Sequence, residues 1–335
     1  KYTGEASILA ILMMIFGVAI LLLNQISVKS RKSYTTVTGK SGQISKFNLG
    51  RSGKYIIAII LIIITFFTSI FPIVSFAFET FLPNPGDYSF LYTGDPDNLT
   101  TKWWVTNENI TENGMYGQQG ILYNDMIWHA YKGTIMVSVC CALTAGTIGT
   151  LIGYAVSKNR RSRWANYVNS MAFLPYLMPS IAVGVAFFIL FSNKYVNLFN
   201  TYALLIIVGT VKYIPFASRS SLNSMLQLSG EIEEAAIIQD IPWTKRMTRI
   251  IIPIQKTSII SGYLLPFMTC LRELSLFILL CVQGFILSTT LDYFDEMGLY
   301  AFSSGINLIL IVTILICNAL VNKATGASLD KGIGG

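Results

Sequence analysis

Apolar residues follow one another in blocks of about 20, separated by shorter polar and charged stretches. A helix of about 20 apolar residues is long enough to cross the hydrocarbon core of a bilayer. The pattern therefore predicts an all-α membrane protein. The fifth block is short and holds Lys212, whose ammonium can reach the interface from a position near the end of a span. The seven predicted spans are residues 6–27, 55–77, 134–156, 172–191, 202–216, 258–282 and 301–321.

The composition agrees with this assignment. Hydrophobic types make up 53% of the 335 residues and charged types only 12%, whereas soluble domains carry about 25% charged residues. This excludes an ordinary soluble enzyme and a disordered chain. The cysteines fall inside apolar blocks without a CxxC pair, so we interpret them as small apolar residues rather than disulfide or zinc ligands. They are Cys140, Cys141, Cys270, Cys281 and Cys317.

The charges alternate between the loops. Loops 28–54 and 157–171 hold basic residues and no acid, whereas loops 78–133 and 283–300 are predominantly acidic. Basic loops stay on the cytoplasmic side, so we expect the N-terminus outside, the C-terminus inside and loop 217–257 in the cytoplasm. The net charge of +7 is then a topology signal rather than a sign of nucleic-acid binding. We expect the long outer loop 78–133 to form a small cap or to lie on the membrane interface.

Sequence signals for catalysis are weak. Gly39-Lys40-Ser41 ends like a phosphate-binding loop, but Tyr34 stands where the first glycine belongs. His129 is the only histidine, which is too few for a multi-histidine metal site. We therefore predict no catalytic residue, metal site or cofactor in this chain, and an energy source in another subunit or an ion gradient.

The cytoplasmic stretch 217–257 is longer than a connection requires. Residues 230–239 predict a short helix, with Glu231 and Glu233 at its positive N-terminal end. A second helix is expected from Pro242 onward. From the residues alone, this stretch fits either a helix lying on the lipid surface or one that docks on a partner. One face of the first helix would hold Ile232, Ala235, Ala236 and Gln239, and the second helix would hold Lys245, Arg246 and Arg249.

The same stretch resembles a known signature. Its spacing matches E-A-A-x3-G-x9-I-x-L-P, the signature of binding-protein-dependent ABC transporter permeases. Asp240 replaces the glycine and Ile252 replaces the leucine. Glycine at this place commonly supplies a left-handed turn, which aspartate tolerates better than most residues. In the family this loop forms the coupling helix, which sits in a cleft of the ATPase subunit. The resemblance thus implies coupling roles for Glu234, Ala235, Ala236, Asp240, Ile250, Ile252 and Pro253.

The resemblance covers about residues 55–321 and implies a six-helix ABC importer permease core, here preceded by one additional transmembrane helix. It implies import through a bacterial cytoplasmic membrane, driven by a separate cytoplasmic subunit that holds ATP and Mg. It also implies an extracytoplasmic substrate-binding protein and either another permease half or a second copy. A secondary transporter is the less favoured alternative, because the sequence shows no internal repeat and few intramembrane charges.

The N-terminal region resembles part of a fused permease. Within the basic cytoplasmic linker 28–54, the stretch Tyr34-Thr-Thr-Val-Thr-Gly-Lys40 followed by Asn48-Leu-Gly-Arg51 resembles the linker that joins the two halves of ferric-iron uptake permeases. Residues 1–27 would then be the last helix of a preceding half or its remnant. The remaining residues, 322–335, are expected to form a cytoplasmic tail. Ferric iron is the cargo that this resemblance implies, and polyamine, thiamine or phosphonate cargo would look similar.

Two charges are expected deep in the sixth predicted span. Arg272 and Glu273 lie near the middle of residues 258–282, where charges are costly and commonly paired or functional. The alternatives are a structural bond between helices and a place in the gate or transport pathway.

Overall fold

The computed structural model describes residues 50–325 except 85, 90–98, 111–116 and 194, together with scattered helical positions between 8 and 19. Most of the predicted span 6–27, the linker up to residue 49 and the tail after residue 325 therefore lie outside the described residues.

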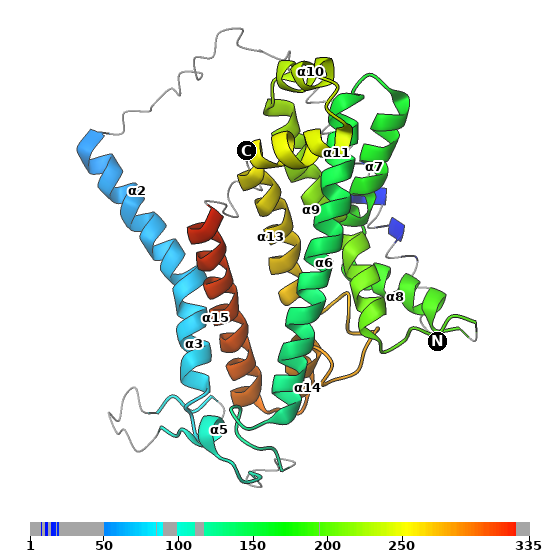
Figure 1. The fold of residues 1–335 in the computed structure, drawn as a ribbon. Helices are drawn as coiled ribbons and strands as arrows, with labels where there is room; N and C mark the ends of the chain where they lie inside the picture. The colour runs from blue at the N-terminus through cyan, green and yellow to red at the C-terminus, as the bar shows by residue number, and fades with distance from the viewer. Residues whose placement is uncertain are drawn as a thin grey trace.

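Long helices run side by side along most of the molecule, with short helices at both ends (Figure 1). One end carries α10 and α11, and the other carries α5 and α14. The elements are α2 (Gly50–Thr65), η1 (Phe66–Ile70), α3 (Phe71–Glu79), α5 (Lys102–Val105), α6 (Asp125–Lys158), α7 (Arg163–Leu177), α8 (Ser180–Phe191), α9 (Tyr202–Gln227), α10 (Gly230–Ile238), α11 (Trp243–Arg246), η4 (Met247–Ile251), α12 (Ile252–Ile254), α13 (Lys256–Leu271), α14 (Leu287–Glu296) and α15 (Tyr300–Thr325).

Four continuous helices among the described residues are long and apolar enough to cross a membrane, and two bent pairs bring the count to six if each pair is one span. The predicted spans 55–77 and 301–321 are confirmed by Ser52–Glu79 and Tyr300–Lys323. The predicted spans 134–156 and 202–216 are too short, because α6 begins at Asp125 and α9 continues to Gln227. The outer loop is shorter than the predicted 78–133, because residues 125–133 belong to α6.

Helices α6 and α9 form the centre of the fold through small residues. A Cβ atom added to Gly149 would lie 2.5 Å from the Cβ of Ala217 and 2.7 Å from the backbone nitrogen of Ser218. At Gly153 it would lie 2.7 Å from both Ser221 and the backbone of Leu222. Small residues let helix backbones approach closely inside membranes. The sequence of α6 therefore fixes the distance to α9.

The predicted helix 172–191 is wrong as a single element. Its residues belong to α7 and α8, which meet at a bend of 102°. Pro179 has no N–H and holds Met178 in an extended conformation, so the helix stops there. Lys212 of α9 donates from Nζ to the carbonyl oxygens of Pro175 at 3.0 Å and Met178 at 2.6 Å.

The short fifth block had indicated that Lys212 lies near the end of a span, and this prediction is wrong. The residue lies in the interior of α9 and is only 9% exposed. The last carbonyls of a helix lack partners within that helix. The ammonium of Lys212 supplies a partner for the carbonyls where α7 ends.

The predicted helix 258–282 is also wrong in its second half. Helix α13 ends at Leu271, and residues 272–286 form turns before α14 begins. Leu276, Phe277 and Leu280 of this segment are buried in the core formed with α6 and α9. Non-helical backbone is tolerated at membrane depth where protein surrounds it.

The described part of loop 78–133 forms a packed cap, which agrees with one of the two expectations for it. Trp103 of α5 is fully buried, and its ring nitrogen donates to the carbonyl oxygen of Leu82 at 2.7 Å. Its ring meets Phe302 of α15 edge-on, with centroids 6.2 Å apart. Asn124 then caps α6 by accepting from the backbone nitrogens of Met126 and Ile127.

Candidate coupling site at helix α10

Helix α10 forms where the sequence predicted it, and it ends in a left-handed turn. Asp240, at the glycine position of the signature, has φ of 52°. Its backbone nitrogen donates to the carbonyl oxygen of Ile237, and that of Ile241 donates to Ala236. The expectation that aspartate preserves the turn is confirmed. Helix α11 then begins directly after Pro242.

Replacement of Asp240 tests whether the left-handed backbone conformation at this position matters for stability. Asp240→Gly is expected to preserve or raise stability, whereas Asp240→Val should lower the free energy of unfolding by about 1–2 kcal/mol, because a β-branched residue is poorly accommodated at positive φ. Thermal unfolding of the purified variants in detergent measures the difference. Equal stabilities of the two variants would show that this turn is not constrained.

The signature residues do not share one environment. Most are exposed or half-buried, and their exposure leaves a surface on α10 that a partner can reach. Ala236 alone is buried, so the predicted face of small residues is split between the surface and the interior. Ile238, at 82% exposed, and half-exposed Trp243 lie on the outside of the same loop. The exposed members are Glu234, Ala235, Asp240 and Pro253, and the half-buried ones are Ile250 and Ile252.

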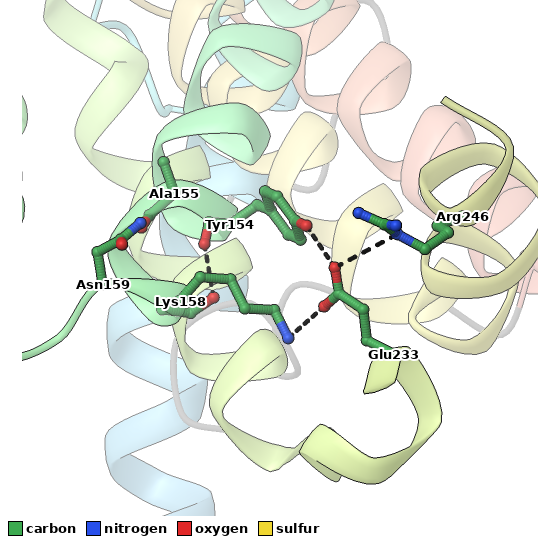
Figure 2. Close-up of polar contacts among 7 residues, drawn as sticks. Tyr154, Ala155, Lys158, Asn159, Glu233 and Arg246 are labelled. Carbon is green, nitrogen blue, oxygen red and sulfur yellow. Dashed lines mark hydrogen bonds and ion pairs between the residues drawn. The ribbon is translucent and has the colours of Figure 1, made fainter. Parts of the chain in front are cut away.

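The carboxylate that holds α10 in place belongs to Glu233, next to the signature residue Glu234. Figure 2 shows it pointing toward side chains from α6 and α11. Its Oε1 accepts a hydrogen bond from the Tyr154 hydroxyl at 2.5 Å and lies 3.9 Å from Nε of Arg246. Its Oε2 forms an ion pair with the Lys158 ammonium. One side chain therefore connects the loop to the end of α6.

The electrostatics keep this carboxylate charged. Glu233 is only 5% exposed, and burial raises the pKa of its carboxyl. Bonding from Lys158 and Tyr154 and the charge of Arg246 outweigh that effect, so the pKa lies below its usual range. Arg246 also donates to the carbonyl oxygen of Ile241 at 3.0 Å, which ties α11 to the turn after α10.

Sequence reasoning singled out Glu233 only for its place in the first turn. The basic partner Lys158 is far away in the chain, at the end of a different helix, and no spacing rule relates the two.

Arg272 and Glu273 lie in different environments although they are adjacent in the chain. Both lie beyond the end of α13, and no ion pair joins them or links either to another described residue. Glu273 accepts from the Tyr213 hydroxyl at 2.9 Å and from the backbone nitrogen of Leu276 at 3.1 Å. Arg272 is exposed. Glu273 thus bonds to α9 and to its own turn.

Comparison with known proteins gives a consistent picture. A family model described as binding-protein-dependent transport system inner membrane component matches residues 145–327. The ferric transport system permease protein FbpB of Actinobacillus pleuropneumoniae is 22% identical over 83% of this chain and 37% of its own length. The putrescine transport system permease protein PotI of Escherichia coli (strain K12) is 26% identical over 58% of this chain and 68% of its own.

A solved structure shares the fold. It is a bacterial alginate ABC transporter in complex with an alginate pentasaccharide-bound periplasmic protein, matched with a TM-score of 0.56 at 15% identity. The match covers 82% of this chain and 96% of the other. By contrast, the chain spans about two fifths of the length of the ferric relatives it matches.

Proposed function

Because this chain belongs to the family of binding-protein-dependent transport system inner membrane components, we propose that it is the permease subunit of an ATP-driven importer. The observation that carries the proposal is the exposed surface of α10, which bears the coupling signature and is anchored on α6 through Glu233. A separate cytoplasmic subunit would hold ATP and Mg and hydrolyse ATP. Its closure would move residues 230–256 as a lever and switch the spans between inward-open and outward-open states.

The orientation follows from the same proposal. The α10 end of the molecule is cytoplasmic, and the cap formed around α5 and α14 faces outward in a bacterial cytoplasmic membrane (Figure 1). The N-terminus is then outside and the C-terminus inside, as the basic loops indicate. An extracytoplasmic binding protein would deliver cargo to the cap side. The complex of the alginate transporter with a periplasmic protein supports such a partner for this fold.

Ferric iron is the cargo we propose, with polyamine, thiamine or phosphonate as alternatives. The ferric relatives support iron, and the match to PotI keeps a polyamine open. The greater length of the ferric relatives supports a fused arrangement, in which residues 1–27 correspond to the last helix of a preceding permease half. Without that half, a second copy would complete the pathway. Arg272 and Glu273 are proposed to line the gate or pathway.

Substitution on the exposed face of α10 tests the coupling role. Ala235→Trp is expected to reduce uptake at least tenfold, because a large ring on an exposed docking face prevents close approach of the ATPase subunit. The matched control Ala235→Ser keeps the residue small and should retain uptake. Transport of labelled ferric iron, with co-purification of the ATPase subunit, measures both. Normal transport by stably inserted Ala235→Trp would contradict the proposal.

A further inference from the structure

A cavity of about 460 Å³ is lined by residues from the end of α3 and the beginning of α15. These helix ends lie at the end of the molecule opposite α10 (Figure 1). Its volume is within the range of small-molecule sites, about 300–1,000 Å³. The cap formed by the described part of loop 78–133 adjoins it through Gly86. The proposed coupling and transport roles assign no function to this cavity.

Two carboxylates line the cavity, Glu79 in the last turn of α3 and Asp295 in α14. Glu79 accepts from the Tyr88 hydroxyl at 3.0 Å and from the backbone nitrogen of Gly86 at 3.2 Å. Asp295 accepts from the Ser303 hydroxyl at 3.2 Å. All these donors are neutral, and neither carboxylate forms an ion pair with a described residue. The negative C-terminal end of α3 adds to their potential. The cavity therefore favours a cation.

A buried hydroxyl supplies an independent indication of a ligand. Ser304 lines the cavity and is only 6% exposed, and its side-chain hydroxyl forms no hydrogen bond with any residue that the structure describes. A hydroxyl that borders a cavity without a protein partner is free to form a hydrogen bond with a ligand or with water. Asn307, one turn further along α15, adds an amide to the same wall.

The lining favours an ammonium group over a metal ion. The described residues contain no group of three or more His, Cys, Asp or Glu side chains able to hold a metal. Carboxylates and hydroxyls accept hydrogen bonds from N–H donors, and two aromatic residues, a class that attracts cations, also line the cavity: Phe76 and Tyr300. We propose that this cavity binds a primary alkylammonium group.

Two sources offer this chemistry, a free small amine and the ethanolamine headgroup of a phospholipid. The cavity adjoins the end of the span Ser52–Glu79, where lipid headgroups lie. Both present three N–H donors, which a quaternary choline lacks. A polyamine, one of the cargoes considered above, also carries primary ammonium groups, so the proposal rests on the lining of this cavity and not on which cargo the transporter moves.

The test uses the purified full chain in amine-free detergent. One arm follows the unfolding midpoint by tryptophan fluorescence while ethanolamine or choline is added. The other compares retained phosphatidylethanolamine and phosphatidylcholine by native mass spectrometry. A saturable preference for ethanolamine in the first arm identifies a free amine, and a preference in the second identifies the lipid. Glu79→Gln and Asp295→Asn should weaken the preference for the ammonium ligand at least tenfold. The control Glu296→Gln changes an exposed residue of α14 outside the lining and should leave that preference unchanged.

Ser304→Val keeps both carboxylates and replaces the hydroxyl with an apolar group, so it tests the proposal even if the carboxylate variants fail to fold. It should also abolish the preference. Equal responses of the wild type, Glu79→Gln and Ser304→Val in both arms would overturn the proposal. So would an equal response to ethanolamine, choline and Mg²⁺, because that pattern reflects charge alone.

Discussion

Glu233→Ala is expected to reduce uptake at least tenfold while ATP hydrolysis continues. The substitution removes the carboxylate that joins α10 to Tyr154 and Lys158 of α6, so motion of the loop is no longer transmitted to that helix. Loss of a hydrogen bond to a charged group costs about 1.5–3 kcal/mol, and it leaves two cationic side chains beside the vacated site. Transport and ATP hydrolysis, measured together in proteoliposomes, give the coupling ratio.

Controls distinguish transmission from a general loss of stability. Glu231→Ala removes an exposed acid two residues away and should leave the coupling ratio unchanged. Exchange of charges in the pair Glu233→Lys with Lys158→Glu should restore part of the transport that either single change removes. Unchanged coupling in stable Glu233→Ala would show that α10 does not act through this contact.

The pH dependence of the same contact has a definite sign. The pKa of the Glu233 carboxyl is lower in the folded chain than in the unfolded chain. Its contribution to stability is therefore present above the ordinary carboxyl pKa of about 4.3 and is lost as the pH falls through the lowered value. The difference in unfolding free energy between wild type and Glu233→Ala should therefore narrow as the pH falls through this lowered value.

Gly149→Leu is expected to prevent correct packing of α6 on α9. A Cβ at this position would already approach backbone atoms of α9 at 2.7 Å, and backbone does not move aside as a flexible side chain does. Overpacking of a core costs about 1–3 kcal/mol, and a leucine between two helix backbones belongs at or above that range. We expect little folded protein after detergent extraction, as measured by size-exclusion chromatography.

Leu151→Phe is the matched control for that substitution. It adds bulk two residues away in α6, but on a side chain that is exposed in this chain. It should insert and extract normally. Extraction of folded Gly149→Leu at wild-type yield would mean that α6 and α9 can separate without loss of the fold.

The sequence predicts those parts of the structure that depend on apolar length or local turn chemistry. The spans at residues 55–77 and 301–321, the short helix α10 and the left-handed turn at Asp240 are of this kind. The breaks at Pro179 and Leu271 were missed because apolar residues resume beyond them, and hydropathy does not distinguish a helix from buried turns. Pro179 was visible, but its effect depends on whether another group can satisfy the freed carbonyls.

Long-range polar contacts were beyond the reach of sequence patterns. Lys212 and Glu233 each meet partners from another helix, and periodicity along one helix carries no information about such pairs. The motif match indicated the correct loop and the neighbouring acid Glu234. Only the three-dimensional arrangement shows which of two adjacent glutamates faces the body of the protein.

Helix α9 connects the interior residue Lys212 to the loop that holds α10. The helix has 26 residues, which corresponds to a rod of about 39 Å. Only Leu228 and Ser229 separate its last residue from α10. On the N-terminal side of Pro215 in the same helix, the ammonium of Lys212 donates to the carbonyl oxygens of Pro175 and Met178, where α7 ends. We therefore expect a displacement of α10 to be transmitted along α9 to the carbonyls at the end of α7, so that the bend between α7 and α8 changes together with the position of α10.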